Sequence, residues 1–388
     1  MGSRWHPKRR FPDSLLDKES SEKLHYFDKG FVLHHQMIEE VFSSLKRKVI
    51  GQSDQSIALV SGPTGVGKTL LCQMLMEHYW NDYDGHEDLI TNLPAIYIEA
   101  SVSSIAALSM KDFYIRLLHE MDYPENIKVY GFPVLDGSGK GKLFSGRKAT
   151  EEELARYVET RLGDYNCKCL IIDEFQHFIK FGGKLGERLL DILKGLSNKT
   201  GCKLICVGTY ESVMSLQKSA QLARRTIDIE FPAYSHSSDY SNDSYLSAFL
   251  GLLSHVPIKL DDGLLSHKDE VFVGCCGCIG ILKQWVYRAL SDALNSNDSA
   301  LGIKHFYNTK LANRDLLRIA EEIKEGKAFY ADVDLNDVSA MLGVQEDTLN
   351  DRAVSSNESN CNEEKILDLK SKKNRRPGER KPVRDICE

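Results

Sequence analysis

The chain has 388 residues, of which 42% are hydrophobic and 27% are charged, and its formal net charge at pH 7 is −6. This composition is ordinary for a globular protein, and the length suits two domains or one large domain with appendages. The negative net charge excludes a polycation, so any nucleic-acid binding must use local basic patches. No apolar run approaches the ~20 residues of a membrane span and no secretory signal is evident, so we expect a cytoplasmic protein without membrane contact.

Two segments precede the first predicted strand. Residues 1–33 contain a basic, aromatic stretch from Arg4 to Pro12, which is either a solvated arm or a docking segment for DNA or a partner protein. Between His34 and Val49, apolar residues recur at helical spacing and predict a helix packed in front of that strand.

A glycine-rich turn separates an apolar run at residues 57–60 from a segment of helical character. Residues 61–69 read Ser-Gly-Pro-Thr-Gly-Val-Gly-Lys-Thr, which fits the phosphate-binding loop pattern between a strand and a helix. Glycines let main-chain N–H groups turn toward phosphates, and the next helix adds its N-terminal positive charge. We expect ATP to bind here, with Lys68 on the phosphates and Thr69 on Mg²⁺. The expected nucleotide-binding residues of the loop are Gly62, Pro63, Thr64, Gly65, Val66, Gly67, Lys68, Thr69 and Leu70.

An acidic pair, Asp173 and Glu174, follows the apolar run at residues 169–172. Such a run predicts a buried parallel strand that ends at a site. We expect Asp173 to hold the Mg²⁺ water shell and Glu174 to polarise the attacking water.

Further strands are predicted at residues 95–100, 203–207 and 227–231, in alternation with helices. This order predicts an α/β fold with a parallel sheet covered on both faces. Ligands of such sheets bind beyond the carboxyl ends of the strands, where Thr209 would join Lys68 and the acidic pair. Thr150 and Glu153 form a capping-box pattern that predicts the start of the next helix. Residues 124–148, which precede this helix, predict a mobile basic loop, which is either a simple surface excursion or a ligand contact.

After Pro232 only helices are predicted, at residues 240–254, 279–294 and 311–325, and they indicate a small all-helical domain. From residue 344 the chain is polar and then basic, which is typical of a disordered tail. Cys275, Cys276 and Cys278 are either metal ligands or free thiols; the paired C-x₂-C spacing is missing, which favours free thiols. The expected domains are 1–33, an N-terminal arm; 34–232, the nucleotide-binding domain; 233–343, the helical domain; and 344–388, the tail.

The order of phosphate loop, Asp-Glu strand, polar strand end, paired arginines and helical domain resembles AAA+ ATPases, whose helical domain is a lid. The block from Cys206 to Arg225, Cys-Val-Gly-Thr-Tyr-Glu-Ser-Val-Met-Ser-Leu-Gln-Lys-Ser-Ala-Gln-Leu-Ala-Arg-Arg, is similar to that of the TniB/TnsC transposition ATPases of Tn7-like elements. The resemblance covers roughly residues 34 to 325. It implies that Thr209 is the sensor-1 residue, that Arg224 or Arg225 is an arginine finger, and that Lys283 replaces the sensor-2 arginine without its bidentate fork.

The resemblance also implies an ATP-dependent homo-oligomer on double-stranded DNA, either a ring of six or seven subunits or a helical filament. This assembly would link a target-site selector, a DNA-binding protein or a CRISPR complex, to the transposase. DNA would be held through its phosphates. The candidate contacts are Lys111, Arg116, Lys140, Lys142, Arg147 and Lys148.

Two other functions compete with a transposition regulator. One is an AAA+ ATPase of another class, such as a replication-initiator or clamp-loader-like protein or a defence-system ATPase, and the other is a nucleotide-gated switch without DNA. The block that ends at Arg225 favours the transposition regulator. The sequence carries no nuclease carboxylate cluster, so we expect no DNA cleavage by this chain.

Overall fold

The structure is a computed structural model that describes residues 8–51, 56–81, 93–100, 110–122, 132–135, 141–144, 149–179, 183–216, 226–236 and 238–342. It divides into two compact units, Met1–Tyr330 and Ala331–Glu388. The boundary expected after residue 232 falls within the first unit, and the expected domain limits stay predictions.

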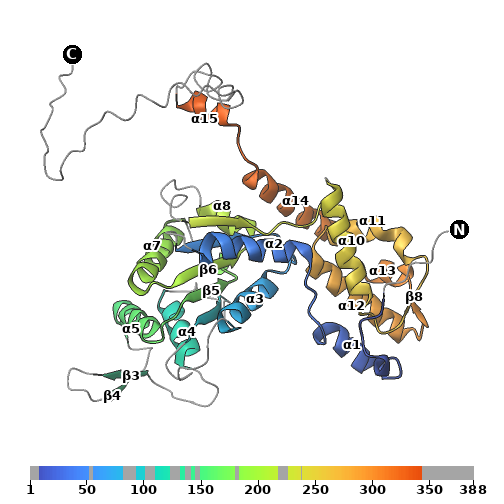
Figure 1. Ribbon diagram of the computed structural model, residues 1–388, viewed down its shortest axis with the longest axis horizontal. Coiled ribbons are helices and arrows are strands. Elements are labelled where there is room, and N and C mark those ends of the chain that lie inside the picture. The colour runs from blue at the N-terminus through green and yellow to red at the C-terminus, as the bar shows by residue number, and fades with distance from the viewer. Residues whose placement is uncertain are drawn as a thin grey trace, which may run out of the picture. The chain divides into compact units, whose positions relative to one another are not determined.

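A five-stranded parallel sheet organises the first unit, in the order β2-β5-β6-β1-β7. Its strands follow the predicted ones closely, so the predicted α/β class with a parallel sheet is confirmed (Figure 1). The apolar, β-branched runs form these strands because both faces of the sheet are covered. The strands are β1 (Ile57–Ser61), β2 (Ala95–Glu99), β5 (Cys169–Asp173), β6 (Lys203–Gly208) and β7 (Thr226–Glu230).

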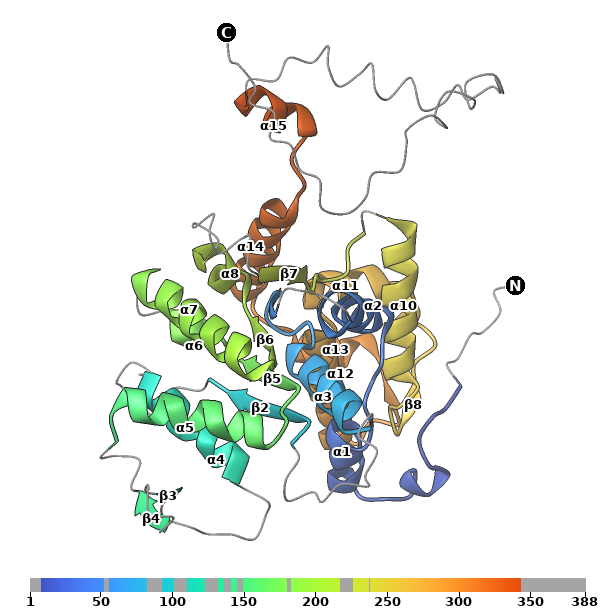
Figure 2. The ribbon, with the colours of Figure 1, turned by 60° about the vertical axis from the view of Figure 1, so that its left-hand side comes forward.

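Alternate residues of β1, β2, β5 and β6 enter two separate cores, as the period of two requires. Ala58 and Val60 of β1 belong to a core shared with the helices before and after that strand and with the C-terminal helices. Ile57 and Leu59 face the other core. The helices around the sheet are α2 (Gln36–Leu45), α3 (Lys68–Asn81), α4 (Met110–Asp122), α5 (Glu151–Asp164), α6 (Gln176–Ile179), α7 (Gly183–Thr200) and α8 (Tyr210–Leu216), and the short π-helix η2 (Lys46–Ile50) follows α2 (Figure 2). Before them, the short 3₁₀ helix η1 (Asp13–Leu15) leads to α1 (Ser20–Lys29), which packs against α12 (Ile279–Asn295) of the C-terminal part (Figure 1).

The structure confirms the predicted capping box but differs from the predicted loop at residues 124–148. The capping box is present, because Glu153 N donates to Thr150 Oγ1 at 3.2 Å and Thr150 N donates to Glu153 Oε2 at 2.9 Å. The segment predicted as a loop without regular structure contains an antiparallel pair, β3 (Phe132–Leu135) and β4 (Gly141–Phe144). Glycine and lysine content suggested a loop there, but the flanking apolar residues pair as strands.

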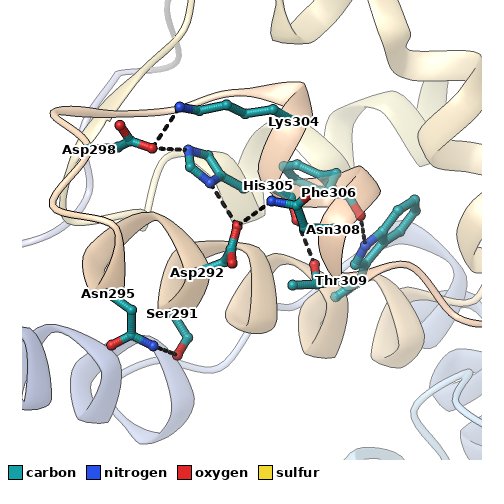
Figure 3. Close-up of polar contacts among 10 residues, drawn as sticks. Ser291, Asp292, Asn295, Asp298, Lys304, His305, Phe306, Asn308 and Thr309 are labelled. Atoms are coloured by element: carbon teal, nitrogen blue, oxygen red, sulfur yellow. Dashed lines mark hydrogen bonds and ion pairs between the residues drawn. The ribbon is translucent and has the colours of Figure 1, made fainter.

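The C-terminal part of the first unit is helical apart from a two-residue parallel pair, β8 (Lys259–Leu260) with β9 (Ala300–Leu301), in the described residues. Figure 3 shows a polar cluster that joins two of its helices. His305 Nδ1 lies 3.0 Å from Asp292 Oδ2, and Trp285 Nε1 donates to the Phe306 carbonyl at 2.9 Å. These bonds join the helix that begins at Ile279, which reaches the phosphate loop, to the helix that begins at Ile303. The elements are α10 (Asp239–Leu253), η3 (Leu264–His267), α11 (Lys268–Cys275), α12 (Ile279–Asn295), α13 (Ile303–Thr309) and α14 (Asn313–Tyr330).

The second unit contributes one described helix, α15 (Leu335–Met341). The side chain of Asp334 caps it by accepting a hydrogen bond from Asn336 N at 3.0 Å. The expected tail from residue 344 onward lies outside the described residues.

Candidate nucleotide site

The phosphate loop joins β1 to α3, and two of its glycines adopt left-handed backbone conformations. Gly65 has φ of +80° and Gly67 has φ of +117°, which side chains with a Cβ rarely adopt. Gly62 is needed for a different reason, because a Cβ there would lie 2.1 Å from the Phe231 carbonyl oxygen. The glycine pattern therefore follows from backbone geometry at all three positions.

Lys68 is the first residue of α3 and its ammonium group lies inside the loop. Nζ donates to the carbonyl oxygens of Gly62 and Pro63, each at 3.0 Å. Burial lowers the pKa of Lys68, while the charges of nearby carboxylates act in the opposite direction. A cation held over this loop by main-chain carbonyls is suited to attract phosphate oxygens.

Thr69 and Asp173 meet beside Lys68, although one begins a helix and the other ends a strand. Thr69 Oγ1 donates to Asp173 Oδ2 at 3.1 Å, and Tyr97 donates to the same oxygen at 3.2 Å. Asp173 is 1% exposed. A hydroxyl and a carboxylate oxygen are the hard ligands that Mg²⁺ prefers, so these two residues fit the expected metal.

Glu174 follows Asp173 in a strained backbone conformation, with φ of +54°. Its N–H donates to Asp173 Oδ1 at 2.8 Å, and its own carboxylate accepts a hydrogen bond from Gln176 Nε2. His177 Nε2 lies 3.8 Å from Glu174 Oε2. A non-glycine residue keeps a left-handed backbone conformation only where its surroundings hold it there, and such residues are frequent at functional sites.

Thr209 follows the end of β6, next to this carboxylate pair along the sheet edge. Its Oγ1 is buried and has no hydrogen-bond partner among the described residues. Its carbonyl oxygen accepts from Ser212 Oγ at 2.6 Å. The structure thus brings Lys68, Thr69, Asp173, Glu174 and Thr209 to the carboxyl ends of neighbouring strands.

Lys283 does not join this group through any contact that we observe. On α12, its Nζ donates to the Asp28 carbonyl oxygen at 3.0 Å and lies 4.8 Å from the centroid of the Phe31 ring. Gly280 of the same helix approaches the loop instead, because its N–H donates to the Gly65 carbonyl at 2.7 Å. A nucleotide-binding role for Lys283 stays a prediction.

The approach of α14 to the phosphate loop was not predicted from the sequence. Burial raises the pKa of the Glu322 carboxyl on α14. A hydrogen bond from the Thr64 N–H and the charge of Lys68 partly oppose this rise. Tyr330 at the end of α14 lies with its hydroxyl 2.9 Å from Ser61 Oγ. Long-range contacts of this kind leave no local pattern that would have predicted them.

The remaining predicted residues divide into two groups. Lys111 and Arg116 lie on α4, where an Arg116 guanidinium nitrogen donates to the Glu99 carbonyl at 3.4 Å. The side chains of Lys140, Lys142, Arg147, Lys148, Arg224 and Arg225 lie outside the part of the chain that the structure describes.

Two other expectations concern metal binding by the clustered cysteines and the crossing of a membrane. Cys275, Cys276 and Cys278 are free thiols, and within the described ranges no group of three His, Cys, Asp or Glu side chains is arranged to hold a metal ion. Among the helices that the structure describes, none combines the length and the apolar character needed to cross a membrane.

Comparison with known proteins agrees with this geometry. Residues 51–214 match the family model described as an AAA domain. Comparison with curated proteins gives no significant match. Similar solved structures include Cdc6p from Pyrobaculum aerophilum, with 14% identity, a TM-score of 0.51 and coverage of 85% of this chain and 90% of that chain. The Walker-type ATPase of Pyrococcus abyssi has 15% identity, a TM-score of 0.48 and coverage of 75% and 76%, respectively. At 14% identity the likeness to Cdc6p concerns the fold alone, and together with the matched AAA domain it supports an AAA+ P-loop NTPase fold.

Proposed function

We propose that this chain is an AAA+ ATPase that binds and hydrolyses ATP with Mg²⁺ to control its own assembly on double-stranded DNA; the match of residues 51–214 to an AAA domain and the likeness of the fold to Cdc6p support this. The contact of Thr69 with Asp173 at 3.1 Å carries the nucleotide part of this proposal, since it joins the two expected magnesium-binding oxygens beside Lys68. Assembly on DNA is proposed from the sequence block that ends at Arg225. Mg²⁺ would neutralise charge on the phosphate oxygens as the terminal phosphoryl group transfers to water.

Each residue then has one task. Lys68 and the main-chain N–H groups of the loop hold the phosphates, Thr69 and Asp173 hold the metal and its water, and Glu174 accepts the proton of the attacking water. Thr209, whose Oγ1 is buried without a partner in the described structure, would contact the terminal phosphate. Arg224 or Arg225 would reach the nucleotide of a neighbouring subunit in a ring or filament.

The finer proposal is a regulator of transposition that links a target-site selector to a transposase. It depends on the sequence block from Cys206 to Arg225, which is similar to that of the TniB/TnsC ATPases. Lys111, Arg116, Lys140, Lys142, Arg147 and Lys148 are proposed to contact DNA phosphates. A transposase and its selector are the protein partners that this function requires.

ATP hydrolysis should be measured with and without double-stranded DNA, together with DNA co-sedimentation. We expect DNA to stimulate hydrolysis, and Lys68→Ala to abolish it because the charge at the phosphates is lost. Hydrolysis without DNA stimulation or co-sedimentation would leave only a nucleotide-gated switch. DNA-dependent hydrolysis without an effect on insertion in a reconstituted transposition reaction would favour an AAA+ ATPase of another class.

A further inference from the structure

Gln176 is a buried amide placed against the proposed catalytic carboxylate. It begins α6, two residues after Glu174, and is 7% exposed. Its Nε2 donates to Glu174 Oε2, and its Oε1 is buried without a hydrogen-bond partner among the residues described. A buried oxygen without a hydrogen bond costs free energy. Its presence beside a functional carboxylate therefore indicates that a ligand donates a hydrogen bond to it.

The end of β6 leaves space for this amide. A Cβ at Gly208 would lie 3.0 Å from Gln176 Oε1 and 2.7 Å from Ser212 Oγ, so a larger residue there would have to displace one of these side chains. The next residue, Thr209, presents a second buried oxygen that lacks a partner in the described ranges. Two buried oxygens without a partner in the described ranges, Gln176 Oε1 and Thr209 Oγ1, therefore lie just beyond the carboxyl ends of the neighbouring strands β5 and β6.

We infer that Gln176 is a positioning residue for hydrolysis, whose Nε2 orients the Glu174 carboxylate and whose Oε1 accepts a hydrogen bond from the attacking water. This inference rests on the proposed ATP hydrolysis. One water proton is taken by Glu174, and the other stays bonded to oxygen and points at Gln176 Oε1. The water oxygen bonds to the terminal phosphorus while the bond from that phosphorus to the ADP oxygen breaks.

The first test replaces the amide by a side chain of similar length without donor or acceptor, Gln176→Met. Gln36 provides a matched control, because its Nε2 donates to Glu40 Oε1 at 3.0 Å on an exposed surface. We expect Gln176→Met to lower kcat by about ten- to a hundredfold, as small misplacements of catalytic groups do. KM and the affinity for a fluorescent ATP analogue should stay unchanged, and Gln36→Met should alter none of these values.

The second test is the kcat of Gln176→Glu. Its carboxylate keeps oxygens that can accept a hydrogen bond from water, but it cannot donate to Glu174 Oε2 as the amide does. We expect kcat to fall and KM to stay unchanged, because Glu174 loses the donor that orients it. A normal kcat for Gln176→Glu or for Gln176→Met would overturn the inference while ATP hydrolysis stands. A wild-type chain that hydrolyses no ATP would overturn the proposed function and this inference with it.

Discussion

The N–H of Gly280 donates to the carbonyl oxygen of Gly65 at 2.7 Å, so the first turn of α12 is bonded directly to the phosphate loop. A Cβ on Gly280 would lie 2.6 Å from that same oxygen. The helical part of the first unit is therefore bonded to the loop through main-chain atoms. A change in loop conformation on nucleotide binding must either move α12 or break this bond.

Gly280→Ala should separate α12 from the loop. Overpacking of this kind costs about 1–3 kcal/mol, which should lower the midpoint of thermal unfolding and weaken nucleotide binding. Gly263→Ala is the control, since a Cβ there meets nothing within 4 Å. Equal thermal midpoints and nucleotide affinities for the two variants would contradict a coupling through Gly280.

Glu322→Gln should bind ATP more tightly than the wild-type chain. Of the carboxylates that act on the Lys68 pKa, Glu322 has the largest effect, ahead of Glu174 and Asp173. Its charge repels phosphate, so its removal should raise ATP affinity severalfold at low salt and less at high salt. Titration with a fluorescent ATP analogue checks this, with the exposed neighbour Glu321→Gln as the control. Weaker binding by Glu322→Gln would mean that this carboxylate supports the bound nucleotide.

Asp173→Asn should raise the Mg²⁺ concentration needed for half-maximal ATP hydrolysis. The amide keeps an oxygen that can accept the bonds from Thr69 and Tyr97 but loses the negative charge. Loss of a residue that supports a metal typically weakens metal affinity by about tenfold or more. Rates should recover at high Mg²⁺. A Mg²⁺ titration identical to that of the wild-type chain would remove Asp173 from the metal site.

The sequence predicted the sheet and its polar edge, because apolar runs, glycines and acidic residues have local signatures. The meeting of Thr69 with Asp173 followed from the rule that ligands of parallel sheets bind at carboxyl strand ends. The approach of Gly280 and Glu322 to the loop was not predicted, because it depends on how helices far along the chain pack. The resemblance placed Lys283 at the sensor-2 position, whereas in the structure its ammonium group donates to the Asp28 carbonyl oxygen.

His35 should make the stability of the chain fall at acid pH. Burial is the main cause that lowers its pKa to about 4, and Nδ1 lies 3.0 Å from the Tyr234 hydroxyl. The unfolded chain binds this proton from about pH 6.5 downward and the folded chain does not, so stability decreases as pH falls from there to about 4, by ~3 kcal/mol in all.

Urea unfolding at several pH values checks this prediction. His35→Asn should show a shallower loss of unfolding free energy between pH 6.5 and 4 than the wild-type chain does. His25→Asn, which changes an exposed histidine, should keep the wild-type slope. A wild-type slope in His35→Asn would show that other groups cause the acid sensitivity.

The central claim is that ATP controls assembly on DNA, and electron microscopy of Glu174→Gln with double-stranded DNA tests it most directly. This variant keeps the phosphate and metal ligands but lacks the base, so it should bind ATP and hydrolyse it very slowly. We predict rings or filaments on DNA with ATP that persist for long periods, and none with ADP. Assemblies that form equally with ADP, or DNA that stays bare in both states, would contradict the account.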